Sequence, residues 1–229
     1  MVTPYDWQEA IGHRAQFIES RLASGVPVAA VSLEDGIVAA TFRRQSPKIF
    51  EIYDRLMYSA LGQQSDVESL RVTAIDYAHR EGYQRSEQDV TIQRIVTAMS
   101  QPIKDAFANF SSSPWIAKAL FMEVGETMGD DRFYCIDYDG DYINDHFRCC
   151  LCGTPAQAVE MQAQVAEIDV AGKKPKEMAT RLRRILVKAM TAEGATEEEA
   201  MVGLTFEAAI LGRHKTGDRR FQRLTPEDL

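Results

Sequence analysis

The sequence predicts an α+β fold in which two antiparallel sheets stack face to face and each is covered by a pair of helices, a four-layer αββα sandwich. Runs of short strands with tight turns alternate with pairs of amphipathic helices, and one extra helix precedes the first strand. With 45% apolar and 26% charged residues, the composition is that of a globular chain. No internal repeat or low-complexity linker divides it, so we expect one domain over residues 1–229.

The first predicted element is a helix over residues 7–24, preceded by a short segment over residues 1–6. Asp6 and Glu9 have the spacing of a capping box. An apolar stripe runs along this helix. Such a stripe usually covers the chain's own core, although it can also face a neighbouring subunit. It consists of five residues at helical spacing before Gly25: Trp7, Ile11, Ala15, Ile18 and Leu22.

A run of strands and then two helices follow. Asp35-Gly36 and Asp54-Arg55 mark hairpin turns between strands. The capping-box spacing of Ser65 and Glu68 starts the next helix, which Gly82 is expected to close. Its successor starts near residue 86 or 89 and is kinked or shortened by Pro102. The four strands predicted before these helices cover residues 27–33, 37–42, 49–53 and 56–61.

The second half of the chain again shows strands followed by two helices, without sequence similarity to the first half. Asp139-Gly140 joins two of the strands, and Pro155 suits the first turn of a helix. Alternating apolar residues predict a half-buried strand over residues 204–210. The other predicted elements are strands over residues 115–124, 132–137 and 142–151, helices over 155–167 and 175–191, and a last strand over 219–224.

Charge and hydropathy narrow the function classes. With 26 Lys+Arg and 34 Asp+Glu, the net charge is −8, which argues against a nucleic-acid binder. No apolar stretch has the length of a membrane helix, and the first residues lack the pattern of a signal peptide. The four cysteines do not form the framework of a secreted disulfide protein. We expect a cytoplasmic chain with reduced thiols.

Local motifs do not assemble a catalytic or metal site. Alternating aspartates over residues 137–145 could surround Ca²⁺, but their spacing departs from the EF-hand loop and favours a hairpin turn. Cys149, Cys150 and Cys152 contain a CxxC spacing, yet a zinc site needs a second ligand pair. We therefore interpret the three cysteines as small buried residues of a strand.

Other motifs of cofactor or metal binding are missing from the sequence. The four histidines are scattered, no phosphate-binding glycine loop occurs, and we expect neither cofactor nor metal. The basic segment over 173–188 is expected to be a solvated or subunit-facing surface.

Several strings, taken in order, resemble the proteasome family, and within it the bacterial α-type subunits. The similarity covers roughly residues 4–225. No string alone is diagnostic, but their order and spacing together are specific. They are WQEAI at 7–11, EDG at 34–36, KIFEIYDR at 48–55, EGY at 81–83, DVT at 89–91, YDG at 138–140, GT at 153–154 and RRFQRL at 219–224.

The resemblance implies an N-terminal-nucleophile hydrolase fold but no catalysis by this chain. Catalytic β-type subunits release a threonine that follows a glycine at the start of the first strand. Here Gly25 is followed by Val26, whose side chain has no nucleophilic atom. Phe42 stands at the family's acidic position, and only the family lysine is kept, as Lys48. Thr3 precedes the extra helix rather than the first strand, so it is a poor substitute nucleophile.

The resemblance further implies a structural and gating subunit. Such subunits form seven-membered rings that cap rings of catalytic β-type subunits and admit unfolded proteins delivered by an ATP-dependent unfoldase or activator. Lys48 corresponds to the lysine that binds the activator's C-terminal carboxylate, and Thr3, Pro4, Tyr5 and Asp6 fall in the gating segment. Two alternatives stay open: a diverged self-compartmentalised hydrolase, with a thiol as its nucleophile for example, and a cysteine-based redox or metal-binding module.

Overall fold

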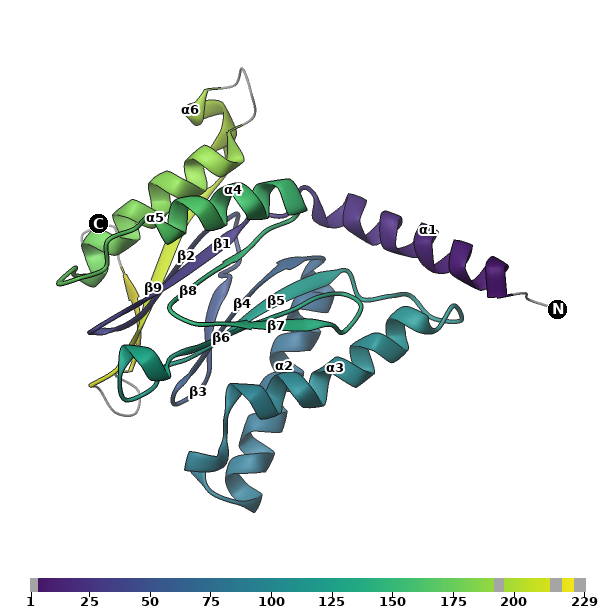
Figure 1. Ribbon diagram of the computed structural model, residues 1–229, viewed down its shortest axis with the longest axis horizontal. Helices are drawn as coiled ribbons and strands as arrows, with labels where there is room; N and C mark the ends of the chain where they lie inside the picture. Colours follow the sequence, from purple (N-terminus) through teal and green to yellow (C-terminus); the bar gives the residue numbers. More distant parts are fainter. Residues whose placement is uncertain (1–3, 192–195, 215–219, 225–229) are drawn as a thin grey trace.

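A computed structural model describes residues 4–191, 196–214 and 220–224 of the chain. Two five-stranded antiparallel sheets face each other, and a pair of helices covers the outer face of each (Figure 1). The predicted four-layer αββα sandwich is therefore confirmed. Among the described residues, no helix is both long and apolar enough to cross a membrane.

The first sheet has the strand order β10-β9-β2-β1-β8. Its strand β1, between β2 and β8, is buried along its whole length, because one face meets the second sheet and the other meets a helix pair. Small side chains such as Ala29 and Ala30 allow this close double packing. The strands are β1 (Val28–Leu33), β2 (Gly36–Arg43), β8 (Arg148–Leu151), β9 (Thr205–Gly212) and β10 (Phe221–Leu224).

The second sheet has the order β3-β4-β5-β6-β7, so each strand pairs with its neighbour in the chain. Its last strand, β7, is exposed throughout and leaves one edge of the sheet unpaired within the described chain. The strands are β3 (Ile49–Tyr53), β4 (Leu56–Gly62), β5 (Ala117–Glu123), β6 (Arg132–Ile136) and β7 (Tyr142–Asp145).

The helices divide the apolar interior into three layers. One layer lies between the sheets, a second lies under α2 and α3, and a third lies under α4 and α5. The helices over the sheets are α2 (Gln64–Gln84), α3 (Ile92–Ala108), α4 (Pro155–Ala166) and α5 (Pro175–Met190), and the short ones are η1 (Glu87–Asp89), η2 (Met128–Asp130) and α6 (Glu197–Ala200).

The single strand expected over residues 142–151 is wrong, because the structure forms two strands there. β7 pairs with β6 in the second sheet, whereas β8 pairs with β1 in the first. Phe147 lies between them with a φ of 71°, and its carbonyl accepts the Ser32 N–H at 2.7 Å. This left-handed residue turns the chain from one sheet to the other.

Two predicted helix boundaries are also wrong. The α2 helix has no side-chain cap, since Ser65 bonds Asp66 instead, and it continues past Gly82 to Gln84. Gly82 serves close packing, because a Cβ there would lie 2.4 Å from the Tyr53 hydroxyl. The α3 helix begins at Ile92, after a Thr91 cap, and not at residue 86 or 89.

The N-terminal helix α1 (Pro4–Leu22) includes Asp6 and Glu9 in its body, so they do not form the expected capping box. Its last turns enter the layer between the sheets, where Ile18 and Leu22 are fully buried. Its other end runs away from the sandwich toward the segment after α3 (Figure 1). The C-terminal part of the apolar stripe therefore covers the chain's own core.

Candidate functional site

A cationic cavity lies where α1 ends and β1 begins. Its volume is about 570 Å³. Of the described residues that line it, four carry a positive charge and none is acidic; the four are Arg21, Arg43, Arg44 and Lys48. In a chain with a net charge of −8, this local excess of cations favours an anionic ligand.

Lys48 is held in this cavity by two oxygen acceptors. Its Nζ donates to the Val26 carbonyl at 2.8 Å and to the Thr41 Oγ1 at 3.4 Å. The Thr41 hydroxyl in turn donates to the Pro27 carbonyl at 2.7 Å, which aims its lone pairs at the lysine. Because a protonated amine has three N–H donors, this geometry leaves one for a ligand in the cavity.

Burial lowers the pKa of Lys48 from 10.5 to about 8, and the negative charge of Glu207 opposes that shift. Desolvation has this effect because a dry environment disfavours the charged amine. The ammonium is still the main form at pH 7. An entering carboxylate would meet a cation that is poorly solvated and therefore gains more from pairing than a surface lysine does.

Glu207, on β9, fixes the backbone around Lys48, and sequence reasoning missed it. The buried carboxylate accepts the N–H of Lys48 at 2.8 Å and that of Ile49 at 3.3 Å. The Arg223 guanidinium donates to the same carboxylate, and it also donates to the Ile49 carbonyl at 3.0 Å. No local signal marks it, because the apolar alternation over residues 204–210 places Glu207 on the face expected to be polar, whereas its burial depends on partners from other strands.

The position of the family nucleophile lies beside the same cavity. The Gly25 N–H donates to the Leu22 carbonyl at 2.8 Å, and the chain runs from the end of α1 through Gly25 and Val26 to β1, which begins at Val28. The nitrogen of Val26 is consequently a peptide amide and not a free amine. Phe42, at the expected acidic position, is buried and packs edge-on against Phe206 at 5.3 Å between ring centroids. This end of the sandwich lacks a nucleophile at residue 26 and a carboxylate at residue 42.

The predicted gating residues are not brought near Lys48. Thr3 lies outside the described residues, while Pro4, Tyr5 and Asp6 form the first turn of α1. Nineteen residues of helix span about 28 Å at a rise of 1.5 Å per residue. Tyr5 is 83% exposed at the far end from the cavity.

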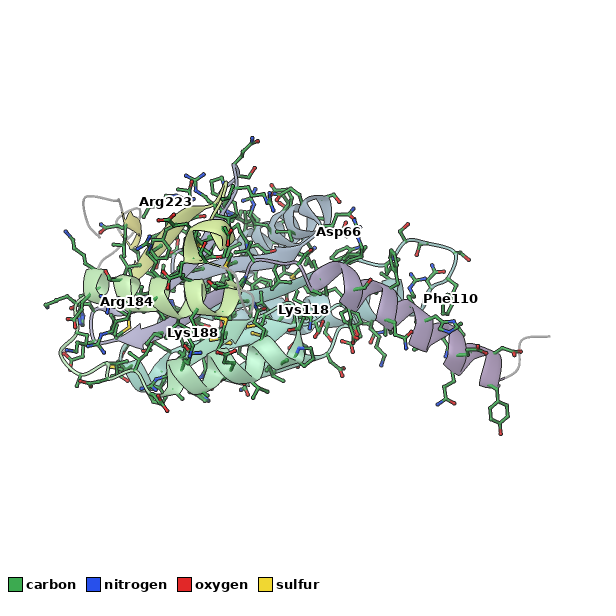
Figure 2. The ribbon with its side chains drawn as sticks, turned by 90° about the horizontal axis from the view of Figure 1, so that it is seen from above. Asp66, Phe110, Lys118, Arg184, Lys188 and Arg223 are labelled. Atoms are coloured by element: carbon green, nitrogen blue, oxygen red, sulfur yellow. The ribbon has the colours of Figure 1, made fainter. Side chains whose placement is uncertain are left out.

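Contacts with the segment after α3 hold the middle of α1 in place. Arg14 donates to the Ala106 and Ser112 carbonyls at 3.0 and 2.9 Å, and its guanidinium stacks on Phe110. Trp7 meets the same ring edge-on, with 5.1 Å between the ring centroids. Figure 2 shows Phe110 beside α1 at this contact.

The three cysteines singled out from the sequence are buried. Burial is the main cause that raises the pKa of Cys150 and raises that of Cys152 to about 12, so neither is an activated thiolate at neutral pH. Within the described part of the chain, no three His, Cys, Asp or Glu side chains are grouped as metal ligands. The acidic loop is the expected turn between β6 and β7, in which the Asp139 side chain accepts the Asp141 N–H.

Several basic side chains of the segment over residues 173–188 have acidic partners. Lys173 and Arg181 pair with Glu177, and Lys188 pairs with Glu160. Arg184 and Lys188 point outward from the helix (Figure 2). The expected solvated surface thus carries weak ion pairs, which offset part of its positive charge.

Two antiparallel sheets face each other between helix pairs, and a glycine and a lysine stand at one open end where the family has them. This arrangement defines the N-terminal-nucleophile hydrolase sandwich. The profile of the family described as "Proteasome subunit" matches residues 23–204. The chain therefore belongs to the proteasome subunit family.

Similar proteins place the chain among the bacterial α-type subunits of that family. The protein named proteasome subunit alpha from Streptomyces avermitilis is 26% identical, over 100% of this chain and 89% of its own length. The protein of that name from Nocardioides is 28% identical, over 97% and 85% of the two chains. The one from Jonesia denitrificans is 29% identical, over 97% and 92%.

Proposed function

We propose that this chain is a non-catalytic α-type subunit of a 20S proteasome core particle, in which it forms the outer ring, restricts substrate entry and docks an ATP-dependent unfoldase or activator. The observation that carries the proposal is the Lys48 ammonium in the cationic cavity, beside a chain that passes through Gly25 and Val26 without a break.

Docking uses the positive charge of the cavity. The C-terminal carboxylate of an activator tail enters it and accepts a charge-assisted hydrogen bond from Lys48. Arg21 and Arg43 line the same cavity and add to its positive potential. Glu207 keeps the lysine backbone in place, so the ammonium does not have to be ordered when the tail binds.

The absence of catalysis rests on the chemistry of residue 26. An N-terminal nucleophile needs a side-chain hydroxyl or thiol together with a free α-amine as base. Val26 offers neither, and Lys48 is engaged by the Val26 carbonyl instead of activating a nucleophile. Cys150 and Cys152 give no support to a thiol hydrolase, because burial raises their pKa values and disfavours the thiolate at neutral pH.

Substrate entry is controlled by residues 1–6 and the helix that follows them. In a seven-membered ring of identical subunits, seven such segments converge on one axis. The contacts of Arg14 with the Ala106 carbonyl and with the Phe110 ring hold each α1 in a fixed direction. That direction sets where the gating segment lies. The partners are further copies of this chain, catalytic β-type subunits, an unfoldase or activator ring and unfolded protein substrates, in the cytoplasm.

Native mass measurement of the particle that co-purifies with the tagged chain tests the proposal. We expect rings with seven copies of this chain stacked on rings of a β-type subunit, and peptidase activity that resides in the β-type subunit. A purified chain that hydrolyses peptides by itself, or a particle without a β-type partner, would contradict the proposal.

A further inference from the structure

We infer that Cys135 and Cys149 form an oxidisable dithiol, a modification site at which hydrogen peroxide joins the two sheets through a disulfide bond. Cys135 lies on β6 of the second sheet and Cys149 on β8 of the first. Their Sγ atoms are 3.1 Å apart. A disulfide bond is about 2.05 Å long, so the sulfurs need to approach by only about 1 Å.

Strand alternation selects this pair from the four cysteines. Neighbouring residues on a strand point to opposite faces of its sheet. Cys149 faces the layer between the sheets, whereas Cys150 and Cys152 face the layer under α4 and α5. Cys152 contacts the Met161 sulfur at 3.4 Å on that side. Cys149 is therefore the thiol of the three that is presented to β6.

A small oxidant can reach both sulfurs. Cys135 lines a cavity of about 350 Å³ together with Lys118 and Asp137. Cys149 lines another of about 290 Å³ beside Arg148. Hydrogen peroxide is little larger than water, so cavities of this size admit it. A bulky alkylating or mixed-disulfide reagent is expected to react far more slowly with Cys149, which is 4% exposed.

The reaction consumes one hydrogen peroxide and two thiols. The Cys135 thiolate attacks one peroxide oxygen, the O–O bond breaks, and the departing hydroxide takes up a proton to become water. The resulting sulfenic acid is then attacked at sulfur by the Cys149 thiolate. The S–S bond forms, the S–O bond breaks, and the second hydroxide leaves as water. The products are one disulfide and two waters.

The reaction accelerates as pH rises. The shared hydrogen bond with Cys149 and then burial raise the pKa of Cys135 well above its ordinary value, so little thiolate exists at pH 7. Because the thiolate is the attacking form, the rate grows about tenfold per pH unit below that pKa. Disulfide formation is consequently slow with trace peroxide and becomes appreciable only at a sustained dose.

The test treats the reduced full chain with hydrogen peroxide, blocks the remaining thiols with N-ethylmaleimide in denaturant so that buried thiols also react, and maps disulfide-linked peptides by mass spectrometry without reductant. We expect one link, Cys135 to Cys149 within a chain, with the loss of two hydrogen atoms, reversed by dithiothreitol and formed faster at pH 8 than at pH 7. A Cys135 oxidised without a link, a link to Cys150 or Cys152, or a link between chains would overturn the inference.

Two serine variants sharpen the assignment. Cys149→Ser should abolish the link, while Cys150→Ser, one residue away on the opposite face of the same strand, should keep it at the wild-type rate. Circular dichroism of both variants checks that each is folded. The wild-type peptide map decides the question even where Cys149→Ser fails to fold, and loss of the link in folded Cys150→Ser would contradict the pairing.

Discussion

The Glu207 carboxylate accepts the backbone N–H of Lys48 at 2.8 Å, although 159 residues separate the two along the chain. The bond ties the start of β3 to β9, so two sheets contribute to the position of one ammonium. Lys48 is thus part of the sandwich framework and not of a free loop.

Replacement of Glu207 should loosen this tie. Glu207→Gln keeps one carbonyl oxygen but turns an amide toward backbone N–H groups, so we expect a loss of about 1–3 kcal/mol in the free energy of unfolding. Urea denaturation measures it. Glu160→Gln is the matched control, because Glu160 has exposed contacts, a 3.7 Å pair with Lys188 and a 3.0 Å hydrogen bond from Gln164, and the change should alter stability by less than about 0.5 kcal/mol. Equal effects would contradict the anchoring role.

Lys48→Ala should abolish activator-stimulated proteolysis and leave ring assembly intact, because it removes the cation and keeps the backbone bond from residue 48 to Glu207. Degradation of an unfolded protein by the reconstituted particle measures the first effect, and native mass measures the second. Lys174→Ala is the control lysine, since it pairs with Asp35 on the surface at 3.6 Å. Unchanged stimulation in Lys48→Ala would show that the cavity is not the docking site.

The pH dependence of docking follows from the pKa of Lys48, about 8 when folded against 10.5 ordinarily. Below pH 8 the amine is charged and binds a carboxylate. At pH 9 it is mostly neutral, so a peptide copied from the activator's C-terminus should bind about tenfold more weakly than at pH 7. Fluorescence anisotropy measures this. The same peptide with an amidated C-terminus should bind weakly at both values.

The sign for stability is opposite. Between pH 8 and 10.5 the unfolded chain holds more protons at this lysine than the folded chain does, so its contribution to folding stability rises with pH in that window. Relative to Lys48→Met, the wild type should therefore gain stability from pH 8 to 10. A difference that stays flat over this range would show that Lys48 is not desolvated.

A buried ion pair at the other end of β1 should be essential for folding. Arg213 donates to both carboxylate oxygens of Asp131, at 2.7 and 2.8 Å, and Ser32 donates to the same group. Asp131→Asn leaves an uncompensated buried guanidinium and should cost about 3–5 kcal/mol. The urea midpoint measures it, and Asp54→Asn, which affects a half-exposed pair with Arg220, should cost under about 1 kcal/mol.

Two glycines test how α1 is seated. A Cβ on Gly153 would lie 2.2 Å from the Leu22 carbonyl, so Gly153→Ala should push the end of α1 out of the core and lower the melting temperature. A Cβ on Gly12 meets nothing within 4 Å, and Gly12→Ala should stabilise the helix by up to about 1 kcal/mol. Calorimetry distinguishes the two. Destabilisation by both would contradict this packing.

The sequence predicted the fold well because turns and periodicity are local. Asp35-Gly36 and Asp54-Arg55 mark their hairpins, and Pro155 begins α4 as expected. Phe147 carried no such signal, since its left-handed backbone depends on the bond from Ser32, which is distant in sequence. Glu207 was missed for the same reason: its partners on β3 and β10 are defined only by the sheet topology.

The seating of α1 limits what a substitution at residue 26 can do. Val26→Thr would supply a hydroxyl, but the nitrogen of residue 26 would remain acylated by Gly25 and the end of the sandwich would remain filled by Ile18 and Leu22. An N-terminal nucleophile at this position requires the new side chain, removal of everything before it, and refilling of the core that the helix now occupies. No single substitution achieves this, so packing as well as chemistry keeps residue 26 from serving as a nucleophile.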